Sequence, residues 1–346
     1  MCKRRPAEVN WSVKRTLVRG PVESITSNPR TYIMSGNVGL DHRWMEEILE
    51  QAGWTSVPVN VDRAMFVWVE LVKKSGFDKR LYDVRCVLKN VVNDQKLRIT
   101  HKWMLYDGMR TYFPDVAKQH MAATSKLAEV EHVPEGRQLI CKPVGRDACA
   151  GRGIERIEND EQLRQKKPDM LRFDPNYVAC DYVTNLLLWH GRKFHVRMYW
   201  LVRPEYDDKP FVQRLHDTGK IMTALLPYKN SDFGNKAIHD THVKSTVRNL
   251  FFPNDLDCAT PEQCAHLFEQ MQKTLACVGQ LLYRAHVGSY AESRYAYEVF
   301  GCDFMVTTDL NVVLLEINQR IGFFCIPTDP DPTRYADFTR RYYEFV

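Results

Sequence analysis

Two short apolar runs separated by a polar turn, within residues 297–318, constrain the fold of this chain more than any other feature. Residues 300–306 and 311–317 are rich in β-branched and aromatic side chains, and the stretch 307–310 between them reads Thr-Thr-Asp-Leu. This composition and spacing is typical of two antiparallel strands joined by a short loop. The sequence therefore predicts a β-hairpin.

The hairpin is expected to bring two carboxylates to one face of a sheet, because side chains alternate between faces along a strand. One face of the second strand is expected to carry Val312, Leu314, Glu316 and Asn318, and the other Val313, Leu315 and Ile317. Pairing Thr307 with Leu310 would set Asp303 opposite Leu314 and diagonal to Glu316, with their Cβ atoms about 7–8 Å apart.

Two ionised carboxylates on an apolar face repel each other and lose hydration unless a positive charge lies between them. Mg²⁺ is bound by one or two carboxylates plus substrate phosphate oxygens, and an amide can add a neutral ligand. The sequence thus suggests a magnesium site at Asp303, Glu316 and Asn318. The alternative is a hairpin edge whose polar side faces water, as in many alternating strands.

The composition is that of a soluble globular protein. The 346 residues are enough for two or three lobes with their own cores, and 44% of them are hydrophobic. No apolar run approaches the ~18 residues of a membrane span, and the first residues lack the apolar segment of a secretory signal. The 10 cysteines form no Cys-x-x-Cys pair, so we expect free thiols of a reducing compartment. We therefore expect a cytoplasmic protein without a membrane partner.

The net charge of +5 is located in the first twenty residues, which hold six basic side chains and one acidic one. We interpret residues 1–28 as a basic N-terminal arm that can steer an acidic protein tail or a nucleic acid. A nucleic-acid binder would interleave aromatic side chains with the cations, and Trp11 alone stands there, so nucleic acid is not an expected partner. A solvated, mobile end is the simpler alternative.

The N-terminal part of the chain reads as a β-α-β unit. Residues 31–34 and 54–59 are predicted strands around a helix over 41–52, which Asp41 would cap and Gly53 would end. The glycines around residue 36 do not form a dinucleotide-binding fingerprint, so this unit predicts an α/β domain without assigning it a ligand.

A predicted strand over residues 138–144 carries Lys142 and runs into a glycine-rich stretch, residues 145–153. Glycines let backbone N–H groups approach phosphates closely, and the lysine adds a point charge. The spacing is not that of a Walker A loop. A phosphate-binding loop and a plain flexible loop therefore both stay open on these residues.

Strict alternation over residues 192–202 predicts a strand with one cationic face. Lys193, His195, Arg197 and Tyr199 point one way, opposite to Phe194, Val196, Met198, Trp200 and Val202. A solvated edge strand is the alternative. Farther along, residues 260–263 have the pattern of a capping box and predict an amphipathic helix to about 287 that packs behind the hairpin.

These pieces stand in a definite order: a lysine strand with a glycine loop, a basic strand, and a terminal hairpin with carboxylates. In that order they resemble the ATP-grasp ligases, and more closely the tubulin tyrosine ligase-like family. The likeness rests on Cys141-Lys142-Pro143, Gly151-x-Gly153-Ile154, Gly191-Arg192-Lys193-Phe194-His195-Val196-Arg197, Gly301-Cys302-Asp303-Phe304-Met305-Val306 and Leu315-Glu316-Ile317-Asn318. It spans roughly residues 30–325.

The resemblance implies an α/β (α+β) ATP-grasp fold with an N-terminal Rossmann-like domain and antiparallel sheets in the central and C-terminal domains. We expect a basic arm over 1–28 and an N-terminal α/β domain over 29–125. A central ATP-grasp subdomain would follow over 126–190, and a C-terminal ATP-grasp subdomain with the metal site over 191–346.

The resemblance also implies roles for single residues. Lys142, Gly151 and Gly153 would hold the phosphates of ATP. The adenine would be read by a hinge of four residues, Cys180, Asp181, Tyr182 and Val183, with Lys193 and Thr241 also at the nucleotide. Asp303, Glu316 and Asn318 would hold Mg²⁺ between the β- and γ-phosphates. Arg197 would stabilise the oxyanion, and Lys220 and His239 would complete the catalytic set.

The implied reaction joins a free amino acid to a protein carboxylate at the expense of ATP, with acidic tubulin tails as the usual acceptors. Three positions depart from the family pattern: His195 replaces an aspartate, Met222 an arginine and His242 an asparagine. Either the substrate is unusual or the activity is weakened. The alternative function is a nucleotide-binding protein that has kept the fold and serves a structural or scaffolding role.

Overall fold

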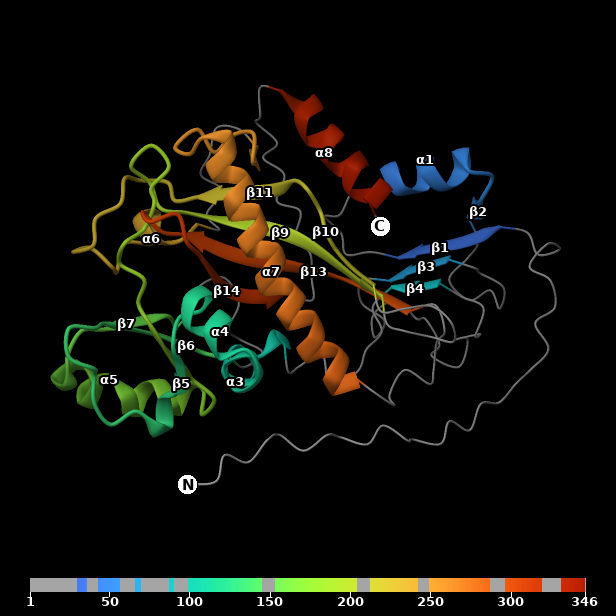
Figure 1. The fold of residues 1–346 in the computed structure, drawn as a ribbon. Coiled ribbons are helices and arrows are strands. Elements are labelled where there is room, and N and C mark those ends of the chain that lie inside the picture. The colour runs from blue at the N-terminus through green and yellow to red at the C-terminus, as the bar shows by residue number, and fades with distance from the viewer. Residues whose placement is uncertain are drawn as a thin grey trace, which may run out of the picture.

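The computed structural model describes residues 30–35, 43–56, 66–69, 87–89, 99–144, 153–203, 212–241, 249–286, 296–318 and 331–345. Its strands form two sheets of unequal size, one of ten strands and one of four (Figure 1). The predicted basic arm over 1–28 and the glycine-rich stretch 145–152 lie outside the described residues.

Antiparallel strands build the larger part of the ten-stranded sheet. They are β9 (Phe194–Arg203), β10 (Val212–Leu215), β11 (Gly219–Thr223), β12 (Leu250–Phe252), β13 (Ala296–Val306) and β14 (Val312–Asn318). The two longest, β9 and β13, pair from Glu298 opposite Val202 to Phe304 opposite Val196. Their alternating β-branched and aromatic residues suit a strand that is covered on both faces.

Short parallel strands extend the same sheet on its other side. They are β1 (Thr31–Ser35), β2 (Thr55–Ser56), β3 (Phe66–Val69) and β4 (Val87–Lys89), with helix α1 (Arg43–Gln51) between the first two. Gly53 ends this unit's helix with a φ of +80°, and Trp54 N–H donates to the carbonyl of Leu49. The predicted β-α-β unit is therefore confirmed. Because β4 pairs with the first residues of β13, the parallel and antiparallel parts are one continuous sheet.

Helix α7 (Pro261–His286) covers one face of the antiparallel strands (Figure 1). Its first turn forms the predicted capping box, in which Gln263 N–H donates to Thr260 Oγ1 and Thr260 N–H donates to Gln263 Oε1. Its apolar face packs in the main core with Leu267, Met271, Leu275, Val278 and Leu282. From β9 the same core takes Phe194, Val196, Met198, Trp200 and Val202, as the alternation predicts.

The hairpin of β13 and β14 forms as predicted, but the predicted register is wrong. Thr307 N–H donates to Asn311 O, so the loop is one residue longer than the assumed Thr307–Leu310 pairing. A β-bulge then shifts the register between Asp303 and Phe304. As a result Asp303 lies directly opposite Glu316 instead of Leu314.

The bulge also corrects the predicted faces of β14, because one extra residue reverses the alternation beyond it. Leu314 packs in the main core together with Phe304, and so does Ile317. Glu316 lies on the other face with Asp303. The prediction that Leu314 shares a face with Glu316 is wrong, and so is the prediction that Ile317 shares a face with Val313.

The four-stranded sheet is antiparallel and has its own small core against helix α5 (Asp160–Phe173). Its strands are β5 (Thr124–Lys126), β6 (Leu139–Lys142), β7 (Glu155–Ile157) and β8 (Val178–Asp181), and the 3-10 helix η3 (Leu127–Glu129) follows β5. Asn159 caps α5 by accepting from Gln162 N–H. The predicted Lys142 strand is therefore present, in the middle of this smaller sheet beside β8.

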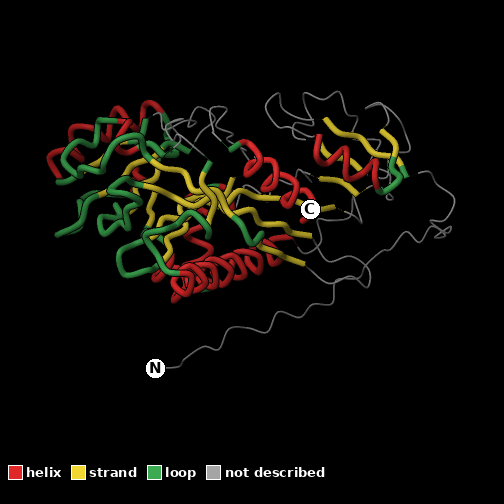
Figure 2. The backbone as a smooth tube through the Cα atoms, turned by 90° about the horizontal axis from the view of Figure 1, so that it is seen from above, coloured by secondary structure: helices red, strands yellow, loops and turns green. Residues whose placement is uncertain are grey.

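The remaining helices are α3 (Lys102–Tyr112), α4 (Pro114–His120), the single turn α6 (Lys236–His239) and α8 (Pro332–Phe345). The antiparallel strands lie between α7 on one face and α8 on the other (Figure 2). None of the described helices is both long and apolar enough to cross a bilayer. The six cysteines among the described residues are free thiols. The predicted domain boundaries stay a proposal.

Candidate functional site

The face of the ten-stranded sheet that points away from α7 carries a row of charged side chains. Lys220 of β11 pairs with Arg197 of β9, Arg197 with Asp303 of β13, and Asp303 with Glu316 of β14. We call these four residues the charged row. Three of them are almost fully buried, so a strip of buried charge lies across the sheet. Such a strip is costly to desolvate unless every charge is compensated.

Arg197 and Asp303 form a bidentate ion pair at the centre of the row. Arg197 Nε donates to Asp303 Oδ1 at 2.8 Å, and Nη2 donates to Oδ2 at 2.7 Å. The side chains are 5% and 2% exposed, so water screens this pair very little. Burial opposes the guanidinium charge, but the Asp303 carboxylate outweighs it and holds the pKa of Arg197 above its usual range.

Glu316 is compensated by a lysine that sequence reasoning missed. Lys102 Nζ lies 2.8 Å from Glu316 Oε2, with side chains 20% and 27% exposed. Burial raises the pKa of Glu316, but the Lys102 ammonium outweighs this and lowers it well below the usual range; in turn, Glu316 outweighs burial and raises the pKa of Lys102. Lys102 is the first residue of α3, where the helix dipole disfavours a cation. Its position therefore serves Glu316 rather than the helix.

Asn318 completes the group of oxygen ligands that the sequence suggests. Its Nδ2 donates to Asp303 Oδ2 and to Glu316 Oε1, both at 3.2 Å, so the amide bridges the two carboxylates. Turning the amide by 180° would aim its oxygen at the same point. No cluster of three His, Cys, Asp or Glu side chains fit for a metal occurs among the described residues. Two carboxylates and one amide with room for phosphate oxygens nevertheless fit Mg²⁺.

Two further lysines, Lys142 and Lys193, lie within electrostatic reach of one another, and Lys142 also reaches Glu316. Lys142 of β6 is close enough for its charge to lower the pKa of both Glu316 and Lys193. Lys193 is 6% exposed, and burial followed by the charge of Lys142 lowers its pKa to about 8. Asp240 acts in the opposite direction. The site thus gathers more cations than anions before any ligand binds, which suits a polyanion.

Of the two glycines predicted at the nucleotide, Gly153 is described and Gly151 lies outside the described residues. Gly153 has a φ of +70°, and a Cβ atom built there would stand 2.5 Å from the Tyr177 hydroxyl. The same hydroxyl donates to the carbonyl of Gly153. Glycine is therefore required at position 153 for both its backbone conformation and the close approach of Tyr177.

The predicted hinge, residues 180–183, leaves β8 and runs toward β9. Asp181 N–H donates to Ala123 O and Tyr182 N–H donates to Gln138 O, so these two amides are used within the protein. The side chains of Cys180 and Asp181 are bound as well, to Thr124 and Arg137 respectively. An adenine ring would therefore have to be read farther along the hinge, from Val183 onward.

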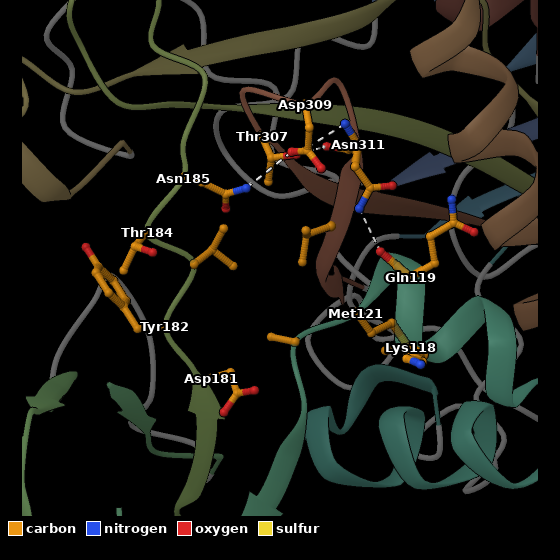
Figure 3. A pocket seen from close by; sticks show the side chains of 13 residues that line it. Lys118, Gln119, Met121, Asp181, Tyr182, Thr184, Asn185, Thr307, Asp309 and Asn311 are labelled. Carbon is orange, nitrogen blue, oxygen red and sulfur yellow. Dashed lines mark hydrogen bonds between the residues drawn. The ribbon is translucent and has the colours of Figure 1, made fainter. Parts of the chain in front are cut away.

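A pocket of about 260 Å³ opens beside this hinge (Figure 3). It lies between the hinge, the end of α4 and the turn of the β13–β14 hairpin, with Val183 and Val313 in its lining. Val313 also belongs to a small apolar cluster with Leu186 and Met305, on the same face of the sheet as Asp303. Polar groups at the rim include Asn185, whose Nδ2 donates to Asp309 Oδ1. The lining combines polar side chains with a few apolar ones.

Three further predicted residues are Thr241, Lys220 and His239, of which Lys220 belongs to the charged row itself. His195 Nδ1 and Thr241 Oγ1 share a hydrogen bond of 2.6 Å, and His195 Nε2 lies 3.8 Å from Asp303 Oδ1. Lys220 Nζ donates to Asn249 Oδ1 at 3.1 Å. His239 packs between the rings of Tyr228 and Phe233, and burial followed by the charge of Lys193 lowers its pKa.

Two departures from the expected family pattern meet in one place. Met222 of β11 pairs directly with His195 of β9, next to the Lys220–Arg197 pair of the charged row. An aspartate and an arginine at these positions would face each other as an ion pair. Here a histidine and a methionine take their places. The third departure, His242, lies outside the described residues.

A ten-stranded sheet and a smaller four-stranded antiparallel sheet are the architecture of the ATP-grasp class of proteins, as a solved structure shows. The C-terminal domain of K. lactis Pby1, described as an ATP-grasp enzyme interacting with the mRNA decapping enzyme Dcp2, has the same fold. Its crystal structure matches with a TM-score of 0.62 and 16% identity, over 91% of each chain. The model of the tubulin-tyrosine ligase family matches residues 91–320. The chain belongs to the tubulin-tyrosine ligase family.

Two curated relatives are each similar to about half of the chain. Mouse tubulin polyglutamylase TTLL5 is 25% identical over 214 residues, which cover 54% of this chain and 15% of the relative. Rat protein polyglycylase TTLL10 is 21% identical over 212 residues, which cover 54% of this chain and 31% of the relative. The chain thus spans less than a third of the length of either relative.

Proposed function

We propose that this protein is an ATP-dependent carboxylate–amine ligase that joins an amino acid to a carboxylate of an acidic protein tail. The observation that carries the proposal is the charged row: Lys220, Arg197, Asp303 and Glu316 lie side by side on the face turned toward Lys142 and Lys193. A strip of this kind suits phosphoryl transfer, in which positioning and charge compensation do most of the work.

Asp303, Glu316 and Asn318 would hold Mg²⁺. When bound there, the ion would neutralise charge on the β- and γ-phosphates of ATP. Arg197 and Lys102 already pair with the two carboxylates, so both carboxylates have a countercharge and a fixed position before ligands bind. Lys142 and Lys193 would hold the remaining phosphate oxygens. The adenine would lie on Met305 and its apolar neighbours, beside Val183.

The proposed chemistry has two steps. An oxygen of the acceptor carboxylate attacks the γ-phosphorus of ATP, forming an acyl phosphate and releasing ADP. The amine of the free amino acid then attacks the acyl carbon, loses a proton, and displaces inorganic phosphate as the amide bond forms. Arg197, fixed by Asp303 in a fork, would stabilise the oxyanion of the second step, a contribution of about 2–4 kcal/mol. Lys220 would add a second positive charge beside Arg197.

The lowered pKa of Lys193 gives a pH test of the nucleotide site. Because that pKa is about 8, Lys193 is largely neutral above pH 8, and phosphate oxygens would draw a proton back onto it. We expect ATP binding at pH 8.5 to take up about half a proton more in the wild type than in Lys193→Met. Calorimetry in buffers of different ionisation enthalpy measures this. Lys166→Met, at an exposed site, is the control; equal uptake in all three proteins would contradict the nucleotide role of Lys193.

The ligase function is tested by offering the purified protein ATP, Mg²⁺ and a panel of labelled amino acids, with tubulin and with cell lysate as sources of acceptor. We expect one amino acid to be incorporated in an ATP-dependent manner, and Glu316→Gln to abolish the incorporation. Glycine and glutamate head the panel, because the two curated relatives are named as a polyglycylase and a polyglutamylase. Nucleotide binding without any incorporation would overturn the proposal.

A nucleotide-binding scaffold is the second candidate function, and one observation favours it. Met222 and His195 face each other where the family pattern has an arginine and an aspartate, next to the Lys220–Arg197 pair of the charged row. A protein of this kind would bind Mg-ATP without turnover. The buried and fully compensated Asp303 favours the ligase, because an idle site has no need to keep a charge that is costly to bury.

A further inference from the structure

An arginine of the smaller sheet reaches across to the larger one. Arg156 is the middle residue of β7, the edge strand of the four-stranded sheet. Its Nη1 donates to Asn230 O at 2.6 Å and to Asn230 Oδ1 at 2.8 Å. Asn230 belongs to the segment 224–241, which follows β11 of the ten-stranded sheet. The side chain of Arg156 is only 9% exposed, so this contact is shielded from water.

Aromatic rings surround the guanidinium. Its carbon lies 5.1 Å from the ring centroid of Phe233 and 5.8 Å from that of Tyr182. Those two rings meet edge to face at 5.8 Å, and Phe233 in turn lies 5.1 Å from His239. Arg156 therefore touches the hinge through Tyr182 and the segment 224–241 through Phe233. Cation–π contacts of this kind are strongest where water is excluded.

The same cluster contains a cation of the proposed nucleotide site. Lys193 Nζ lies 5.7 Å from the ring centroid of Tyr182, on the hinge. The charge of Lys193 and that of Arg156 both act on His239, after burial, to lower its pKa. The Tyr182 ring is thus in contact with two cations. They are Lys193, which would face the nucleotide, and Arg156 of β7.

Elsewhere the segment 224–241 is held by backbone hydrogen bonds to its own sheet. Ala224 N–H donates to Lys193 O, and Tyr228 N–H donates to Gly191 O. The side chain of Arg156 joins the middle of the segment to β7 of the smaller sheet. A lysine could not replace it, because an ammonium has no planar face to stack on the two rings while it donates to both oxygens of Asn230.

We propose that Arg156 is a positioning residue, which clamps the segment 224–241 and Tyr182 onto β7 and so fixes the wall of the nucleotide site that contains Lys193. This inference rests on the proposed nucleotide site. It adds a residue outside the charged row and outside every motif that carries the family resemblance. Because the clamp would act on the site before ligand arrives, its loss should weaken nucleotide binding more than it slows the chemical steps.

Direct binding of ATP, measured by calorimetry without amino acid or acceptor, tests the clamp. We expect Arg156→Gln and Arg156→Lys both to raise the Kd for ATP about 10-fold, since neither keeps the fork and the ring contacts. Asn230→Ala should raise it less, and the double variant Arg156→Gln/Asn230→Ala should bind no more weakly than Arg156→Gln alone. Arg172→Gln is the control, because the Arg172 side chain is exposed on α5, which packs against the smaller sheet. This variant should bind ATP as the wild type does.

The outcomes separate this inference from the proposed function. If the wild type fails to bind ATP, the nucleotide site itself is wrong. If the wild type binds and Arg156→Lys binds equally well, charge alone suffices and the clamp is wrong. Additive effects of the Arg156 and Asn230 changes would also overturn it, because two ends of one contact cannot act independently. Where incorporation is measurable, the KM for ATP should rise about 10-fold while kcat changes less than about 3-fold.

Discussion

Replacing Arg197 with methionine should destabilise the protein by about 3–5 kcal/mol, because the change leaves the Asp303 carboxylate charged and buried without its partner. The pair is bidentate at 2.8 and 2.7 Å and is at most 5% exposed, so little water can take the place of the guanidinium. Asp303→Asn should be destabilising for the same reason, since it leaves the buried Arg197 guanidinium without its carboxylate partner. Urea unfolding of each variant measures the free-energy difference.

The double variant Arg197→Met/Asp303→Asn is the decisive comparison. With both charges removed, no buried ion is left uncompensated, and we expect it to be more stable than Arg197→Met alone. The exposed pair Arg172–Asp169 offers a matched control of the same residue types at 80% and 76% exposure, where each change should stay within about 0.5 kcal/mol. Strict additivity at 197 and 303 would show that the two residues do not depend on each other.

The hairpin shows how far alternation in a sequence can be trusted. It predicted two paired strands that bring Asp303, Glu316 and Asn318 together, and the structure confirms this. It also predicted the wrong partner for Asp303, because the true register depends on the loop length and on a bulge at Leu315. Neither the loop length nor the bulge can be recognised from the alternation of apolar and polar residues. The carboxylates lie closer than the predicted register would have put them.

Lys102 shows the opposite case, a site residue with no signal of its own. It stands more than two hundred positions before Glu316, in an apolar-rich stretch that the sequence does not assign to either helix or strand. Its one unusual feature is that it places a cation in the first turn of a helix, where the helix dipole disfavours positive charge. The joining of β4 to β13 was equally hidden, since pairing between distant strands has no local pattern.

The departures at 195 and 222 could be read from the sequence only as separate changes. Their direct pairing across β9 and β11 places the two departures at facing positions of one strand pair, beside Lys220 and Arg197, and no local pattern in the sequence predicts this. An unusual substrate and a scaffolding role therefore both stay candidate explanations of the departures.

Glu316→Gln should abolish ligation while leaving the fold intact, and this separates a metal-binding carboxylate from a structural one. We expect turnover to fall at least about 100-fold, equivalent to about 2.7 kcal/mol of barrier. The unfolding midpoint should barely move, because Lys102 is 20% exposed and its freed ammonium can reach water. The pKa of Glu316 is depressed, so its pairing stabilises the protein fully above the ordinary value of 4.5 and is lost only as the pH falls through the lowered value. Activity near neutral pH should therefore show no acid limb from this residue.

A titration of activity against Mg²⁺ with Lys102→Met as the matched variant identifies the role of Glu316. Lys102→Met keeps the carboxylate and removes the ammonium that competes with the ion for it, so it should need no more Mg²⁺ than the wild type for half-maximal activity. Glu316→Gln should need far more, or fail to saturate. If the two variants lose activity equally and share the Mg²⁺ midpoint of the wild type, Glu316 acts only as the partner of Lys102. The magnesium site would then have to be sought away from β14.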